Sequence, residues 1–393
     1  MEYRLDKKTG NKLSVLGMGC MRLPRGVGGI DMQRTELTIL TAFERGINYF
    51  DTAYSYNGSE EALGEVVERN NLREHIYIAS KLPHGKCKSI DDVERLFTTS
   101  LERLRTDYLD YYLMHNFVTA DQWRRLVELG MEDWISQKKA SGQIRRVGFS
   151  FHGGIAEFRQ LLEDYDWDLV QIQYNYVNEH YQAGREGMEL AASKGIPVVI
   201  MEPLLGGRLA TGLPKKAAAE LAKVDADRSH ASWGLRWLFD QPEVTVVLSG
   251  MNSEQMVDDN CATAAATAPG SMTESEHAAI VAARDAFQES FKVPCTGCNY
   301  CMPCPQGLSI PSIFAAYNES YSLGWYAGFF QYMLSIGVTS SEPRLASNCV
   351  KCGACAKKCP QHIEIPDRFD DVCRRLQPPG LKVALKVAHP FLS

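Results

Sequence analysis

The chain has 393 residues, a net charge of −6 and a composition that is 45% hydrophobic and 23% charged. Its length exceeds that of one ordinary domain, so two domains are expected. An acidic balance without a lysine- or arginine-rich face argues against nucleic acid and anionic membranes as partners, and no apolar run approaches the roughly 20 residues that span a bilayer. Because the first residues also lack the apolar core of a signal peptide, a cytoplasmic location is expected.

The first two thirds of the chain alternate short apolar runs with helical patterns. Residues 3–16 surround a turn signal at Lys8-Thr9-Gly10 and predict a hairpin that closes the bottom of a barrel. Strand-then-helix units then occur eight times in about 260 residues, which predicts an α/β fold with a (β/α)8 TIM barrel; a doubly wound sheet is the less favoured alternative. The predicted strands are 15–18, 48–50, 76–80, 108–114, 146–150, 169–174, 197–201 and 244–248, and the predicted helices are 31–45, 59–69, 90–104, 121–139, 154–165, 184–194, a longer region ending at 239, and 253–266.

Four chemically reactive side chains fall at the ends of predicted strands. Asp51 directly follows the second strand and Tyr56 lies in the loop after it, and the next two strands are followed by Lys81 and His115. The carboxyl ends of barrel strands meet at one face, so these side chains are expected to converge. His84 and His152 lack this context and are expected in loops, although His152 could reach the barrel mouth.

The four residues suit the reduction of a carbonyl group. Hydride transfer leaves an alkoxide, and a tyrosine phenol can protonate it if a buried ammonium lowers the phenol's pKa and a carboxylate holds the ammonium. Tyr56, Lys81 and Asp51 are assigned these three roles. His115 is expected to orient the carbonyl oxygen or to assist the proton transfer. The alternative is an Asp–Lys ion pair with a tyrosine packed nearby.

Twelve cysteines are present, and eight of them form two dense runs near the C-terminus. In a reducing compartment this pattern indicates metal ligands rather than disulfides. The second run, Cys349-x2-Cys352-x2-Cys355-x3-Cys359-Pro360, has the bacterial ferredoxin spacing for [4Fe-4S] clusters. The first run, Cys295-x2-Cys298-x2-Cys301-x2-Cys304-Pro305, differs by one residue in its last gap. Two structural zinc sites are the alternative.

By analogy with two-cluster ferredoxins, the fourth cysteine of each run serves the other cluster. The expected ligands are Cys295, Cys298, Cys301 and Cys359 for one cluster, and Cys304, Cys349, Cys352 and Cys355 for the other. The four cysteines outside the runs are each expected to be small buried apolar residues. The 44 residues between Cys304 and Cys349 are rich in aromatics and are expected to form packed helices; a lid over the barrel mouth is the alternative.

These patterns predict how the chain is divided. The small and polar segment 262–271 ends in Pro269-Gly270 and is typical of a linker. The expected parts are a barrel over 1–268, a linker and helix over 269–291, a smaller, mainly helical, ferredoxin-like domain over 292–376, and a C-terminal tail over 377–393.

The segment from Asp51 to Glu60, Asp-Thr-Ala-Tyr-Ser-Tyr-Asn-Gly-Ser-Glu, resembles the signature of the aldo-keto reductases. Asp51, Tyr56, Lys81 and His115 match the catalytic tetrad of that family. The resemblance extends over roughly residues 1–265 and includes Gly148-Phe-Ser150, Gln171-x-x-Tyr174-Asn175, Glu202-Pro-Leu-Leu-Gly-Gly207 and the segment Gly250–Asn260. It implies an oxidoreductase that reduces a small-molecule carbonyl with a nicotinamide hydride donor and with Tyr56 as general acid.

The resemblance also implies a cofactor site. Ser150 and Gln171 would hold the nicotinamide amide, and backbone amides at the start of the helix after Gly250 would hold a cofactor phosphate. The other residues that it places at the cofactor are Cys20, Met21, Met201, Pro203, Leu204, Asn252 and Asn260.

Three positions depart from the family pattern. Phe151 stands where an asparagine usually follows the serine, and Met201 stands where an aromatic side chain usually stacks on nicotinamide. The cationic residues that usually bind the adenosine 2′-phosphate are replaced by Asn252, Ser253 and Met256. The loss of these cations favours NADH over NADPH.

Nicotinamide passes two electrons as a hydride, whereas each cluster passes one. In one hypothesis the barrel uses NAD(H) and the clusters are structural or serve an electron-transfer protein partner. In a second, a flavin in the barrel takes single electrons from the clusters and Tyr56 still protonates the product. A third is a non-catalytic electron-carrier or regulatory subunit, against which the intact tetrad argues.

Overall fold

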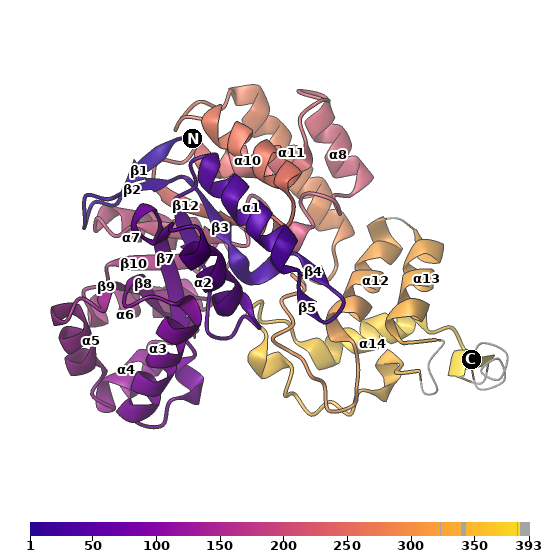
Figure 1. Ribbon diagram of the computed structural model, residues 1–393. Helices are drawn as coiled ribbons and strands as arrows, with labels where there is room; N and C mark the ends of the chain where they lie inside the picture. The colour runs from indigo at the N-terminus through magenta and orange to yellow at the C-terminus, as the bar shows by residue number, and fades with distance from the viewer. Residues whose placement is uncertain (323, 339–342, 383, 386–393) are drawn as a thin grey trace. The chain divides into compact units, whose positions relative to one another are not determined.

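The computed structural model describes residues 1–393 except 323, 339–342, 383 and 386–393 (Figure 1). The chain forms two compact units, each made of two segments. Unit 1 contains Met1–Leu204 and Arg228–His277, and unit 2 contains Leu205–Asp227 and Ala278–Ser393. None of the described helices is both long enough and apolar enough to cross a membrane.

Unit 1 is a closed barrel of eight parallel strands, which confirms the predicted fold. Around the barrel the strands follow the order β10-β11-β12-β3-β6-β7-β8-β9. Their side chains are almost completely buried, because a parallel barrel has a filled interior and an outer layer of helices. The strands are β3 (Leu16–Gly19), β6 (Tyr49–Asp51), β7 (Tyr77–Leu82), β8 (Leu109–Phe117), β9 (Ile144–Phe151), β10 (Leu169–Gln173), β11 (Val198–Met201) and β12 (Val244–Ser249).

A hairpin precedes the barrel, as the sequence predicts. Strand β1 (Tyr3–Leu5) pairs antiparallel with β2 (Lys12–Ser14). Leu13 of β2 is fully buried in one apolar cluster with Tyr49 and Tyr111 from the barrel interior, and the Tyr111 hydroxyl donates to Asp6 at 2.8 Å. The hairpin therefore covers the amino-terminal end of the barrel. A second, very short hairpin, β4 (Arg25–Gly26) and β5 (Gly29–Ile30), precedes the first helix.

Helices alternate with the barrel strands, and several begin where the sequence supplies a cap. The side chains of Asp31, Ser89 and Ser253 each accept a backbone N–H of the helix that follows. The predicted helix 121–139 is instead two helices, because Gly130 adopts φ 92° between them, a conformation that ends a helix. The helices are α1 (Met32–Glu44), α2 (Ser59–Arg69), α3 (Ile90–Leu104), α4 (Asp121–Glu128), α5 (Met131–Ala140), α6 (Ile155–Asp164), α7 (Gly184–Ser193), α9 (His230–Phe239) and α10 (Glu254–Ala265).

Unit 2 is mainly helical around its cysteine runs. Its helices are α8 (Lys215–Ala222), most of α11 (Glu274–Ser290), α12 (Ile310–Ser322), α13 (Trp325–Ser335) and α14 (Ile365–Leu376). Helices α12 and α13 lie side by side (Figure 1) and share an apolar core with α14. Tyr332 is fully buried there, whereas Tyr326 and Phe330 on the same helix are exposed. The aromatic connection between the runs therefore lies largely in helices that pack into this unit.

Two polar anchors position the first cysteine run within unit 2. The buried Asn318 side chain accepts the backbone N–H groups of Lys292 and Val293 at 3.1 and 3.0 Å and donates to the Val293 carbonyl at 2.7 Å. The Arg208 guanidinium donates to the Cys295 carbonyl at 2.9 Å and lies over the Phe291 ring. The Arg208 contacts help to explain why Leu205–Asp227, which follows β11 in sequence, belongs to unit 2 rather than to the barrel unit.

Candidate active site

A buried ion pair joins two neighbouring barrel strands. The Lys81 ammonium on β7 lies 2.7 and 2.6 Å from the two carboxylate oxygens of Asp51, the last residue of β6, and donates to the Thr52 carbonyl at 2.8 Å. Burial raises the pKa of Asp51 and lowers the pKa of Lys81, and the attraction between the two charges opposes both shifts. Three short contacts therefore fix the ammonium in one position.

Tyr56 and His115 meet beside this ion pair. The Lys81 nitrogen lies 5.1 Å from the centre of the Tyr56 ring, and the His115 ring meets the Tyr56 ring edge-on with centroids 5.7 Å apart. Tyr56 is partly exposed in the loop between β6 and α2, whereas His115 is buried on β8. The structure thus brings all four sequence-predicted catalytic residues together at the carboxyl ends of three adjacent strands.

His115 is held in its neutral form by its surroundings. Burial lowers its pKa well below the usual value of 6.5, and the nearby charges of Lys81, His152 and His84 lower it further. A neutral imidazole offers one donor nitrogen and one acceptor nitrogen. His84 and His152, expected in loops, do lie outside the strands, but both are buried close enough to act on His115.

The residues expected at the nicotinamide ring lie on the next three strands. In the β9–β10 register Ser150 faces Gln171, and in the β10–β11 register Gln173 faces Met201. The Gln171 amide nitrogen donates to the Met201 sulfur at 3.6 Å. Among the described residues, the buried Gln171 carbonyl oxygen has no hydrogen-bond partner.

That oxygen fits an incoming carboxamide. A buried acceptor without a donor costs about 1–3 kcal/mol, and an amide NH₂ group of a bound nicotinamide would remove this cost. The Ser150 hydroxyl oxygen already accepts the Asn116 backbone N–H at 2.7 Å, so its own proton is directed elsewhere. The donors and acceptors present at this position are therefore compatible with the nicotinamide group that the sequence implies.

The asparagine that usually follows the serine has no equivalent side chain at Phe151, which is fully buried against Phe149 and Phe158. Asn116, directly after His115, offers an amide nearby that the sequence analysis missed. It adopts φ 66°, and its buried side-chain oxygen has no partner in the described parts of the chain. Asparagine tolerates this left-handed conformation better than most residues, which was the available sequence signal.

The segment after β12 has the features expected of a phosphate site. Gly250 directly follows the strand and Asn252 lies two residues later. The Ser253 hydroxyl caps α10 by accepting the Met256 N–H at 3.3 Å. Asn260 is buried and donates to the hydroxyl of Ser249, the last residue of β12, at 3.2 Å, so it ties α10 to the end of the strand. A helix start in this position presents backbone N–H groups to an anion.

The remaining predicted cofactor residues occupy two other loops. Cys20 is buried, and burial raises the pKa of its thiol, an effect that the nearby Asp51 increases; Met21, the next residue, is 36% exposed. Pro203 is buried and Leu204 partly buried in the loop after β11. Glu202 in the same loop has φ 54°, an uncommon conformation for a residue other than glycine.

Within unit 2, cysteines of the two runs intermingle. Cys295, Cys298 and Cys301 of the first run line one pocket together with Cys359 of the second run. Burial, together with a smaller effect of the other three cysteines, raises the pKa of the Cys301 thiol to about 12. The pocket therefore contains the complete set expected for one cluster.

Members of the second set are also close together. Burial raises the pKa of the Cys355 thiol, and Cys349 of its own run and Cys304 of the first run raise it further. No group of three or more His, Cys, Asp or Glu side chains is arranged around a single ion in the portions that the structure describes. A [4Fe-4S] cluster is bound through four separate irons, so its thiolates need not converge on one point.

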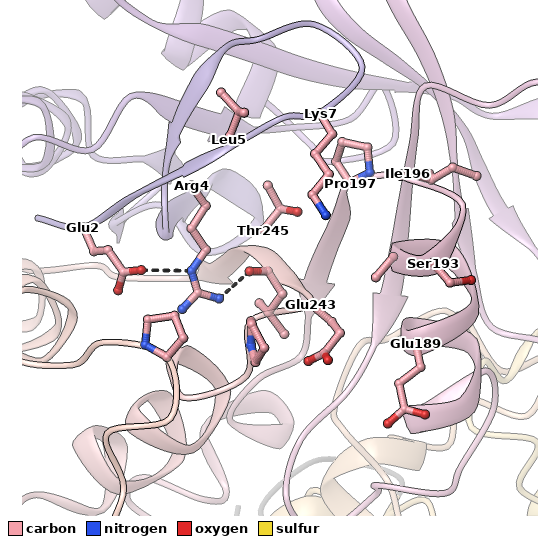
Figure 2. Close-up of a pocket in the computed structure, with 15 residues that line it drawn as sticks. Glu2, Arg4, Leu5, Lys7, Glu189, Ser193, Ile196, Pro197, Glu243 and Thr245 are labelled. Carbon is pink, nitrogen blue, oxygen red and sulfur yellow. Dashed lines mark hydrogen bonds and ion pairs between the residues drawn. The ribbon is translucent and has the colours of Figure 1, made fainter.

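A further pocket in unit 1 lies away from this chemistry (Figure 2). It is lined by the β1 segment and by residues such as Pro197 and Val244, at the amino-terminal ends of β11 and β12. Arg4 forms its inner wall, donating to the Gln241 carbonyl at 2.6 Å and also to the carbonyls of Phe239 and Val244. Active sites of such barrels lie at the opposite face, formed by the carboxyl ends of the strands. An arginine whose guanidinium is hydrogen-bonded to backbone carbonyls at this end contributes to stability.

Comparisons with known proteins find a match for the barrel region and a separate match for the region of the cysteine runs. The aldo/keto reductase family model matches residues 15–284, and a 4Fe-4S dicluster domain model matches residues 294–364. L-galactose dehydrogenase of Arabidopsis thaliana is 26% identical over 294 residues, covering 67% of this chain and 88% of that protein. Methylglyoxal reductase YeaE of Escherichia coli is 31% identical over 228 residues, covering 55% and 74%.

Among solved structures, the holo form of aldo-keto reductase AKR11C1 from Bacillus halodurans shares the fold, with a TM-score of 0.60, 24% identity, and coverage of 72% of this chain and 96% of that one. The relatives named as reductases and dehydrogenases agree with an oxidoreductase. The chain belongs to the aldo/keto reductase family and carries a C-terminal 4Fe-4S dicluster domain.

Proposed function

We propose that this oxidoreductase reduces a small-molecule carbonyl to the alcohol, with Tyr56 as the general acid, and that its C-terminal domain carries two [4Fe-4S] clusters. The observation that carries the catalytic part is the Lys81–Asp51 ion pair beside Tyr56 and His115. A cytoplasmic location is part of the proposal, since dense cysteine runs that bind metal clusters suit a reducing compartment.

Each tetrad residue has a distinct task. A bound nicotinamide would supply the hydride. Tyr56 delivers a proton to the oxygen of the reduced carbonyl, and the Lys81 ammonium stabilises the phenolate that remains. Asp51 holds that ammonium through both carboxylate oxygens. His115, neutral at physiological pH, directs the carbonyl oxygen toward Tyr56.

The cofactor proposed for the barrel is NADH. Gln171 and Ser150 hold the nicotinamide amide, and the start of α10 holds the phosphate. Asn252, Ser253 and Met256 provide no cation for an adenosine 2′-phosphate, so NADPH gains no compensating contact there.

An anaerobic assay with methylglyoxal and D-galacturonate tests this proposal, because relatives bear the names of reductases of these two compounds. We expect oxidation of the reduced nicotinamide with at least one of a panel of small carbonyls that includes them, and a kcat/KM for NADH at least about tenfold above that for NADPH. Absence of turnover with both nicotinamides, together with release of a flavin on denaturation, would instead favour a flavin in the barrel.

Replacing Gln171 with leucine should weaken NADH binding about tenfold, since one buried amide hydrogen bond is lost. The measurement is a fluorescence titration of the anaerobic protein with NADH. The KM for the carbonyl and the thermal midpoint serve as controls and should change little. Unchanged NADH affinity would remove Gln171 from the cofactor site.

A further inference from the structure

The two cysteine runs differ in charge. The first run, residues 295–305, contains no acidic or basic residue, whereas the second, residues 349–360, contains Lys351, Lys357 and Lys358 and no acid. The chain as a whole is acidic, with a net charge of −6, so these lysines are a local excess of positive charge in the sequence of an acidic protein. Ligation of iron alone does not require this difference, because the uncharged first run has the same type of ligands.

The lysines lie directly on the segment that carries the candidate ligands. The Lys351 backbone N–H donates to the Cys349 sulfur at 3.4 Å, and its ammonium pairs with Asp370 at 2.7 Å. The backbone N–H groups of Lys357 and Lys358 donate to the carbonyls of Gly353 and Cys355 at 3.3 and 3.2 Å. The short helix η6 (Ala356–Lys358) is thereby folded against the ligand segment.

All three lysine side chains are exposed, and for Lys357 and Lys358 no acidic partner is found in the described residues. The same segment also carries an exposed apolar side chain and an exposed candidate ligand. Val350 is 60% exposed, and Cys352 is the exposed member of the two runs, the other seven cysteines being buried or partly buried. The second cluster would therefore come closest to solvent at this point.

We propose that this surface, made of Val350, Lys351, Cys352, Lys357 and Lys358 and termed the lysine face, is the docking site for an acidic protein that carries single electrons. The proposal rests on the assignment of Cys352 as a ligand of the second [4Fe-4S] cluster. In the encounter the reduced carrier loses one electron and the second cluster gains it; no bond and no proton is exchanged.

The physical argument is charge complementarity around an exposed apolar centre. Positive groups at the rim of an interface accelerate encounter with an acidic partner, and salt screens the effect. Redox encounters of this type are small and short-lived, so an apolar centre of limited size suffices. In a different role, the lysines would only offset the negative charge of the cluster. Replacing them would then alter the cluster potential, and the encounter rate at equal driving force would stay the same.

The test uses the full-length anaerobic protein and an acidic plant-type [2Fe-2S] ferredoxin, photoreduced before mixing. Reduction of the clusters is followed by stopped-flow absorbance without carbonyl or nicotinamide. The double variant Lys357→Gln, Lys358→Gln should lower the second-order rate constant about tenfold at low salt, and the difference should vanish near ~0.5 M salt. The matched control is Lys215→Gln, Lys216→Gln at the start of α8, another exposed adjacent pair in unit 2, which should leave the rate constant unchanged.

Three further measurements decide between interpretations. Iron content and the midpoint potentials from an EPR-monitored titration should be the same in the variant and the parent protein; a changed potential that accounts for the rate would overturn docking in favour of charge compensation. An equal decrease of the second-order rate constant in the two double variants, or no decrease in either, would also overturn the docking proposal. If the purified protein contained no iron, the cluster assignment itself would be wrong. NADH-dependent carbonyl reduction by the Lys357 and Lys358 variant tests the proposed function separately, and its rate should equal that of the parent protein.

Discussion

Replacing Tyr56 with phenylalanine is expected to lower kcat for carbonyl reduction at least ~100-fold, with little change in the binding of substrate or cofactor. The substitution removes one hydroxyl group and leaves the ring that packs edge-on against His115 and near Lys81. The variant therefore has no phenol to protonate the alkoxide, while the Lys81–Asp51 ion pair stays in place. Steady-state kinetics combined with titration of NADH separates the two effects.

Tyr54→Phe is the matched control, because Tyr54 lies in the same loop and its ring contacts Arg103 and Lys86 rather than the tetrad. It should retain near-parental turnover. Near-parental turnover by Tyr56→Phe would show that the general acid is another group and would refute the catalytic assignment.

The double variant Cys301→Ala, Cys359→Ala is expected to retain one of the two clusters, about four iron atoms per chain compared with about eight in the parent protein. The two cysteines belong to different runs but line the same pocket, so both substitutions damage the same cluster. Iron and acid-labile sulfide analysis of anaerobically purified protein gives the count, and EPR of the reduced protein shows whether one signal persists.

The matched comparison is Cys301→Ala, Cys355→Ala, which pairs cysteines from different sets. Cys355 lies with Cys349 and Cys304, so this variant should lose both clusters. If each run instead bound its own cluster, both double variants would lose all iron. If the parent protein were colourless and contained stoichiometric zinc, both cluster arrangements, with ligands shared between the runs or with one cluster per run, would be refuted.

Local sequence pattern was sufficient for most of the barrel. Apolar runs and capping residues gave eight strands, and helices such as Ser59–Arg69 and Ile90–Leu104 match their predicted bounds. The break at Gly130 was missed because the helical periodicity continues through it, and only the positive φ of that glycine separates α4 from α5. The four tetrad residues could be named because each lies within a few residues of a strand end.

Features that depend on distant contacts were harder to predict. The burial of His84 and His152 and their effect on His115 arise from segments that follow different strands. The role of Asn116 depends on its φ and on its bond to Ser150 across the β8–β9 pair, which no local pattern encodes. Likewise, the contact of Arg208 with Cys295 joins residues 87 positions apart.

The assignment of Leu205–Asp227 to unit 2 bears on how such a protein could arise or be re-engineered. A simple fusion would append one module to the end of another and leave each continuous in sequence. Here the aldo/keto reductase family model spans residues 205–227, yet this segment belongs to the same compact unit as the cysteine runs, and its Leu209 and Leu221 are buried. Transplanting the cysteine runs onto another barrel would therefore have to carry this segment as well, because its Arg208 donates to the Cys295 carbonyl.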